Sequence, residues 1–178
     1  MSYHFGAARQ AGIIVEDIDK AIERWVSTVG AGPFFVARHV PLEFVEFNGE
    51  LTQPDLSVAI GFSGDLEIEL IQQHNDALSP WLNFYENSGP GLHHLSAWTT
   101  EYDNVMARTK LDGFTPNCVG KIAGGARFAY FNADATDGSS FEISDLGVNG
   151  EIGIIHTTAR EAAVGWDGSQ PVRDRKIK

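Results

Sequence analysis

Two short segments of this sequence each place an acidic residue between apolar neighbours, and each closes a similar series of elements. Residues 66–70 read Leu-Glu-Ile-Glu-Leu, and residues 140–144 read Ser-Phe-Glu-Ile-Ser. Alternation of this kind predicts half-buried strands. Each half of the chain also opens on a strand-like run with a polar residue near its start, Gln10 in the first half and His94 in the second. The halves therefore look like two copies of one module, and facing copies would bring four polar side chains to one point.

The order of predicted elements agrees with this repeat. Residues 11–15 form an apolar run without helical period, and Asp17 then precedes apolar residues spaced by three and four as far as Gly30. In the second half, a strand over 93–99 precedes a helical stripe over 102–109. Each module is therefore predicted as β-α-β-β-β. Further strands are expected at residues 34–36, 43–47, 56–62 and 66–72 in the first half, and at 126–132 and 140–144 in the second.

These patterns also divide the chain into segments. The stretch between the modules is polar and contains prolines, with a short helix expected around Trp81. A further helix is expected over 156–164, near the C-terminus. The predicted segments are a first module over 1–72, a linker over 73–91, a second module over 92–147 and a C-terminal extension over 148–178.

Charge and cysteine content narrow the classes of partner. The formal net charge of −11 over 178 residues argues against nucleic acid, which requires clustered Lys and Arg, and against an anionic membrane surface. Cys118 is the only cysteine, so no disulfide can form within the chain. The sequence shows neither a signal peptide nor an apolar run of the roughly 20 residues that a membrane helix needs. We expect a cytoplasmic protein that binds a small molecule.

Three segments resemble the vicinal oxygen chelate superfamily, which includes glyoxalase I, methylmalonyl-CoA epimerase, extradiol dioxygenases and bleomycin-resistance proteins. They are residues 10–19, residues 68–72 and the Gly-Pro-Gly-Leu-His-His-Leu motif at 89–95. The similarity covers roughly residues 8–146 and is nearest to methylmalonyl-CoA epimerase-like members. It implies an α+β fold in which two βαβββ modules form an open, cupped mixed sheet around a metal ion. It also implies a homodimer.

The resemblance implies a set of metal ligands. Carried over position by position, they are Gln10, Glu69, His94 and Glu142. Gln10 departs from the His that the superfamily most often has there. Two carboxylates, an imidazole and an amide favour one divalent ion, Mn, Co, Ni, Mg or Zn, with open positions for water or substrate. Because side chains alternate along a strand, we expect His93 to face away from His94.

The leading hypothesis is a metal-dependent isomerase or epimerase that moves a proton next to a carbonyl through a metal-stabilised enolate. Glu142 would be both ligand and proton shuttle. Alignment puts Gln53 where the epimerases have a second acid, and an amide cannot act as a base. The side chains of Phe34, Phe35 and Trp98 are candidates to line an apolar substrate pocket.

Other functions stay open at this point. An extradiol-type dioxygenase needs two His and one carboxylate around iron(II), and Gln10 weakens that hypothesis. A glyoxalase I-like lyase would use the same site, and a non-catalytic small-ligand binder would use the same cup without a metal. For Glu69, the alternative to a ligand is a solvent-facing position shared with Glu67, since residues two apart lie on one strand face.

Overall fold

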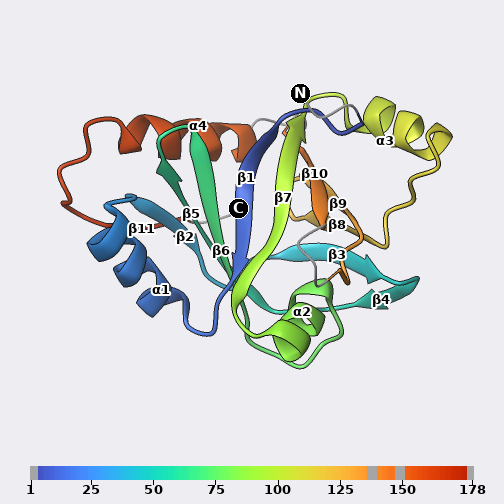
Figure 1. Cartoon of the computed structure of the whole chain (residues 1–178), viewed down its shortest axis with the longest axis horizontal. Coiled ribbons are helices and arrows are strands. Elements are labelled where there is room, and N and C mark those ends of the chain that lie inside the picture. Colours follow the sequence, from blue (N-terminus) through green and yellow to red (C-terminus); the bar gives the residue numbers. More distant parts are fainter. Residues whose placement is uncertain (1–3, 136–139, 147–150, 176–178) are drawn as a thin grey trace.

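The computed structural model describes residues 4–135, 140–146 and 151–175. At its centre, β1 (Ala8–Ile14) and β7 (Gly91–Thr99), the opening strands of the two predicted modules, form an antiparallel pair. Figure 1 shows these strands side by side in the middle of the molecule. Within the described residues, a mixed sheet of 11 strands extends from this pair on both sides. The predicted α+β class with a large mixed sheet is confirmed.

The two sides of the sheet repeat one strand order. Moving outward from the centre, the order is β1-β6-β5-β2 on one side and β7-β10-β9-β8 on the other. In each half, the opening strand pairs in parallel with the last strand of its own half. This is the arrangement that two copies of one module produce. The six flanking strands are β2 (Phe34–Ala37), β5 (Leu56–Ser63), β6 (Leu66–Gln73), β8 (Cys118–Ile122), β9 (Arg127–Phe131) and β10 (Phe141–Asp145).

One strand departs from the predicted modules. The sequence places residues 43–47 in the first module, but β3 (Leu42–Phe47) pairs antiparallel with β8 in the second half. β4 (Glu50–Thr52) pairs with β3 and lies at that edge of the sheet. Val45 and Phe47 are buried there in a cluster that includes Cys118, Phe128 and Tyr130 of the second half. Burial of these side chains therefore decides the pairing, and nearness in sequence does not.

The first helix matches its sequence signals. The side chain of Asp17 accepts hydrogen bonds from the backbone N–H groups of Asp19 and Lys20 and so caps α1 (Ile18–Arg24). The helix continues into one π-helical turn, Trp25–Val29, and ends at Gly30. Gly30 has φ of 73°, a left-handed conformation that glycine adopts without a steric penalty. The predicted helix ending at Gly30 is confirmed, with the π turn as an unpredicted feature.

In the described part of the chain, four α-helices cover the two faces of the sheet. On the outer face, α1 packs on the first half, and α3 (Tyr102–Leu111) packs on the second. On the inner face, α2 (Pro80–Ser88) supplies Trp81 and Phe84 to one buried cluster. α4 (Glu151–Ala163) contributes to another cluster at the opposite end of that face. Figure 1 shows that α2 and α4 lie apart, at opposite ends of the central strands β1 and β7.

The C-terminal extension packs against the first half of the sheet. α4 is longer than the helix predicted over 156–164, and it lies against β5. β11 (Val172–Asp174), which the sequence did not predict, adds in parallel to the edge of β2. In the described part of the chain, no helix is both long enough and apolar enough to cross a membrane.

Candidate metal and active site

Strand register brings the four predicted ligands onto the inner face. Gln10 on β1 lies opposite Ser96 on β7, and Ser96 lies opposite Glu142 on β10. These three residues therefore form one row across the sheet. Alternate residues of a strand share a face, so the residue two positions after Gln10 begins a second row on the same side.

The second row is centred on Gly12. Gly12 lies opposite Glu69 on β6 and opposite His94 on β7. The two rows are adjacent, because only one residue, Ala11, separates Gln10 from Gly12 on β1. Two modules that are far apart in sequence thus place two carboxylates, one imidazole and one amide at the centre of the inner face.

The carboxylates of Glu69 and Glu142 converge on the imidazole of His94. Its Nε2 atom lies 3.5 Å from Oε2 of Glu69 and 3.5 Å from Oε2 of Glu142. His94 Nε2 and Gln10 Oε1 are both buried, and neither has a hydrogen-bond partner among the described residues. Buried polar atoms are nearly always paired, so two unpaired atoms at one place point to a missing partner.

The charges of this group are strongly coupled. Burial disfavours the charged imidazolium, but the ion-pair interactions with Glu142 and Glu69 outweigh it and raise the pKa of His94 to about 9. Burial opposes ionisation of Glu142 as well, yet His94 and the hydroxyls of Ser96 and Ser144 hold its pKa below the ordinary value. The pKa of Glu69 is raised by burial, which exceeds the opposing effect of His94. Without another cation, a proton on His94 balances the two acids.

The same donor set fits a divalent cation in chemical type. Carboxylate, amide and imidazole donors suit Mn, Co, Ni, Mg or Zn, and the two acids would offset the charge of the ion. The cation would take the place of the proton on His94 and would give both unpaired atoms a partner. Within the described residues, no three His, Cys, Asp or Glu side chains are already gathered tightly enough to form a metal-binding group. The donors are therefore neighbours on one face and not a closed cage.

The structure corrects the expectation for His93. The register of β1 and β7 shifts between Gly12, opposite His94, and Ile13, opposite Leu92, so His93 is the extra residue of a bulge. The bulge breaks the alternation of side chains. The His93 ring therefore does not face away from His94, and the two ring centroids lie 5.2 Å apart.

His93 fixes which nitrogen of His94 faces the acids. His93 Nε2 lies 3.2 Å from the carbonyl oxygen of Ala133, which can only accept, so this nitrogen carries the hydrogen. His93 Nδ1, 3.0 Å from His94 Nδ1, must then accept from it. Burial and the charge of His94 lower the pKa of His93 to about 3, which keeps it neutral. In the neutral tautomer, His94 Nε2 is left as a lone pair, the form that binds a metal ion.

Two further polar residues of the site were not identified from the sequence. Glu67 is fully buried, and its Oε1 accepts from Gln10 Nε2 at 2.7 Å. Its Oε2 lies 2.5 Å from Nδ1 of His156 on α4. Because a carboxylate only accepts, Gln10 must turn its amide nitrogen toward Glu67, and its oxygen is left for the ligand position. The sequence held one signal: Glu67 shares a strand face with Glu69, but that face is buried and does not point to solvent.

A small cavity lies beside this group. Its volume is about 90 Å³, well below the roughly 300–1,000 Å³ of pockets for drug-sized ligands. It therefore has room for a small acyl or carbonyl group. Its lining includes Gln10, Glu69, Glu142, His156 and Arg175.

The residues predicted to line a substrate pocket are not brought together. Phe34 is fully buried on the outer face, in the cluster beneath α1. Phe35 and Trp98 pack on the inner face, next to α4, so they lie near the cavity. Gln53 is exposed between β4 and β5, where its backbone carbonyl accepts from Asn75. Strand alternation separates Phe34 from Phe35, and the pairing of β3 with β8 carries Gln53 away from the cavity.

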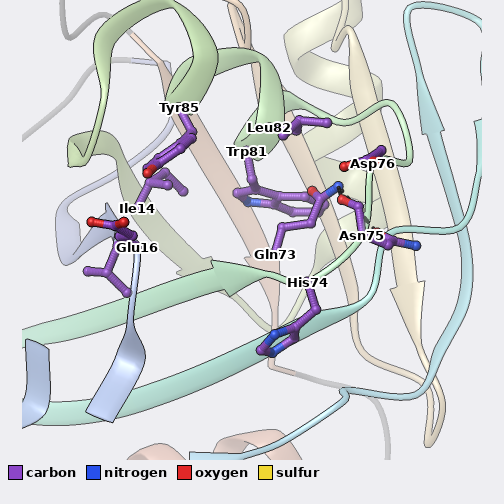
Figure 2. A pocket seen from close by; sticks show the side chains of 10 residues that line it. Ile14, Glu16, Gln73, His74, Asn75, Asp76, Trp81, Leu82 and Tyr85 are labelled. Atoms are coloured by element: carbon purple, nitrogen blue, oxygen red, sulfur yellow. Dashed lines mark hydrogen bonds between the residues drawn. The ribbon is translucent and has the colours of Figure 1, made fainter. Parts of the chain in front are cut away.

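A second hollow, of about 230 Å³, lies at the far end of β1 and β6. Figure 2 shows its side chains, which come from the end of β1 and the residues after it, from the end of β6 and the following loop, and from α2. The polar groups there bond to each other, since Gln73 donates to the carbonyls of Asn75 and Ala77 and accepts from Ser79. This hollow is lined by none of the four predicted ligands. The buried indole nitrogen of Trp81 has no hydrogen-bond partner among the described residues. Three of the four predicted ligands, Gln10, Glu69 and Glu142, line the smaller cavity instead.

The comparisons with known proteins agree with this architecture. The family model described as the glyoxalase/bleomycin resistance protein/dioxygenase superfamily matches residues 9–131, more than half of the chain. No curated protein matches the chain.

Several solved structures share the fold at low identity. A methylmalonyl-CoA epimerase from Mycobacterium tuberculosis has a TM-score of 0.57 at 17% identity, covering 82% of this chain and 91% of that one. A Streptomyces coelicolor methylmalonyl-CoA epimerase variant in complex with 2-nitronate-propionyl-CoA has a TM-score of 0.54 at 18% identity, covering 79% and 94%. A hypothetical protein from Bacillus halodurans has a TM-score of 0.53 at 19% identity, covering 78% and 93%. At these identities, the likeness shows a shared fold.

Proposed function

This chain belongs to the glyoxalase/bleomycin resistance protein/dioxygenase superfamily, and we propose that it is a metal-dependent isomerase or epimerase that moves a proton at the carbon next to a carbonyl. The observation that carries the proposal is a pair of buried atoms without hydrogen-bond partners, Gln10 Oε1 and His94 Nε2. His94 Nε2 lies between two carboxylates. They adjoin a cavity that has room for a small carbonyl group.

The proposed cofactor is one divalent ion, Mn, Co, Ni, Mg or Zn. Gln10, Glu69, His94 and Glu142 would hold it. A bound cation of this kind supplies a Lewis acid that stabilises the negative charge developing on a substrate carbonyl oxygen.

Glu142 is the first proposed proton carrier. Its pKa is held low by His94 and two serine hydroxyls against the effect of burial, so it is ionised and able to accept a proton. Gln53 does not serve as a second acid, because it is an amide on an exposed segment. A second proton-transferring group must therefore come from elsewhere in the chain if the reaction inverts the carbon.

The arrangement gives less support to an extradiol-type dioxygenase. That chemistry needs two imidazoles and one carboxylate on iron(II). His93 stands next to His94, but its nitrogens face Ala133 and His94. It is therefore placed to orient His94 and not to serve as a second ligand.

The proposal is tested with metal analysis and hydrogen exchange. Elemental analysis of the purified protein should find a stoichiometric divalent metal, which falls in Glu142→Gln. The matched control is Glu46→Gln, an exposed acid on β3. Methylmalonyl-CoA serves as the probe substrate. In D2O, the metal-loaded protein should catalyse deuterium incorporation at the α carbon of this probe without consuming oxygen.

Two other results would favour the alternative functions. Oxygen consumption with a catechol would favour the dioxygenase. Protein that binds no metal under any loading condition would contradict the proposal and favour a small-ligand binder.

A further inference from the structure

We propose that His156, on α4 of the C-terminal extension, is the second proton-transferring residue of this site and that Glu67 holds it in place. The inference rests on the proposed function and deepens it, because it names the acid–base group that Gln53 does not provide. Its basis is a hydrogen-bonded chain, Gln10–Glu67–His156, that crosses from the sheet to the helix.

The contact with Glu67 fixes the orientation of the imidazole. Nδ1 of His156 lies 2.5 Å from Oε2 of Glu67, although 89 residues separate the two in sequence. The Glu67 side chain is fully buried, and that of His156 is 11% exposed. Because the carboxylate can only accept, Nδ1 carries the hydrogen, and Nε2 of the neutral ring is left with its lone pair. A carboxylate that orients a histidine in this way is a common arrangement in general base catalysis.

The imidazole adjoins the proposed reaction site. His156 lines the same cavity as Gln10, Glu69 and Glu142. Its ring lies 4.7 Å from the ring of Trp98, which packs beside it on the inner face. Since Nδ1 is engaged by Glu67, Nε2 is the polar atom that His156 has available to the cavity.

Glu67 thus contacts both a proposed metal ligand, Gln10, and the proposed base, His156. One of its oxygens turns the Gln10 amide so that Gln10 Oε1 is left for the cation, and the other holds His156. His156 lies beyond the residues that the superfamily model matches, 9–131. The imidazole reaches the cavity from α4 of the C-terminal extension and not from a strand of either module.

The chemical step is balanced without any co-reactant. Nε2 of His156 takes the proton from the α carbon of the substrate. The electron pair of the broken C–H bond forms a carbon–carbon double bond, and the carbonyl π electrons move to the oxygen. For inversion the two groups hold one proton between them before the step. Where His156 is neutral, Glu142 carries that proton and delivers it to the opposite side of the carbon, and where Glu142 is ionised, His156 carries it and the direction reverses. Return of a proton from the group that took it regenerates the starting configuration.

The orientation of His156 can be tested without a substrate. Long-range ¹⁵N NMR of the imidazoles reports which ring nitrogen carries hydrogen, under mildly alkaline conditions where free histidine is neutral. We expect the Nδ1–H form for His156 in the wild type and its loss in Glu67→Met, which keeps the side-chain length and removes both oxygens. A wild-type His156 with hydrogen on Nε2 would overturn the assignment.

The catalytic role is tested with His156→Gln. Glutamine can still donate to Glu67 but cannot accept a proton from carbon. We expect deuterium incorporation into methylmalonyl-CoA to fall by roughly 10²–10⁴-fold while bound metal stays at the wild-type level. The control is His4→Gln, because His4 also pairs with an acid, Asp112, but next to α3 on the outer face. That variant should change neither quantity.

The outcomes separate this inference from the function on which it rests. If the wild type incorporates deuterium and metal-loaded His156→Gln does so at the same rate, the role of His156 is overturned and the proposed function stands. If the metal-loaded wild type incorporates none, the proposed proton transfer on this probe fails, and His156 loses its catalytic role with it.

Discussion

Gly12 on β1 and His94 on β7 lie opposite each other, and the His94 ring occupies the space in which a side chain at position 12 would stand. A Cβ atom built on Gly12 would be 1.9 Å from Cε1 and 2.3 Å from Nε2 of His94. The imidazole can therefore lie over Gly12 of β1 only because residue 12 has no side chain. Nε2 is the atom that faces Glu69 and Glu142, so this glycine sets the position of the proposed ligand.

Gly12→Ala should displace the His94 ring and weaken metal binding. We expect the affinity for a divalent ion to fall by roughly 10–100-fold, the size of effect seen when the support of a ligand is lost. Titration calorimetry with Mn²⁺ or Zn²⁺ measures it. Gly91→Ala on β7 is the control, because a Cβ there meets Phe84 at an ordinary 3.9 Å. Unchanged affinity in Gly12→Ala would show that His94 is not a ligand.

Removal of the metal should lower the stability of the wild type. A ligand that binds only the folded state at 100 times its Kd adds about 2.7 kcal/mol to the free energy of unfolding. Chelation of the metal should therefore lower the melting temperature of the wild type. It should leave the melting temperature of Glu142→Gln unchanged. Melts of the wild type that do not respond to the chelator would argue against a resident metal.

His93 should make the protein sensitive to acid. Burial lowers the pKa of His93 from 6.5 to about 3 in the folded state. Between these two values the unfolded chain binds a proton at this residue and the folded chain does not, so stability falls as the pH decreases. The slope from this residue is at most about 1.4 kcal/mol per pH unit.

The variant His93→Phe isolates this contribution, because phenylalanine does not titrate. Urea unfolding at several pH values should show a shallower loss of stability below pH 6.5 in the variant than in the wild type. The comparison uses slopes, since the variant also loses the contacts with Ala133 and His94. Parallel curves would mean that His93 is protonated in the folded state.

Arg127 should matter for stability. Its Nε donates to Asp145, a buried acid, at 2.8 Å, and its guanidinium lies 4.4 Å from the ring centre of Tyr102. Arg127→Met keeps the apolar stem but removes the charge, and we expect a loss of ~1.5–3 kcal/mol in the free energy of unfolding. Arg38→Met removes the more exposed ion pair with Asp19 and should cost less than ~1 kcal/mol. Equal losses in urea unfolding would contradict this ranking.

Local patterns predicted most of the elements. The N-cap at Asp17 and the stop at Gly30 gave the first helix, because these signals depend on residues that are close in sequence. These local patterns did not predict that β3 pairs with β8. That pairing is decided by the burial of Val45 and Phe47 against the other half of the sheet.

For the candidate site, the sequence alone determined which side chains share a strand face. Gln10 and Gly12, like Glu67 and Glu69, lie two residues apart, and alternation fixes that relationship for any extended chain. Only the tertiary structure decided that this face is buried, that a bulge turns His93 toward His94, and that α4 brings His156 to Glu67. Those outcomes depend on register and packing between segments far apart in sequence, and the period of a single strand does not contain that information.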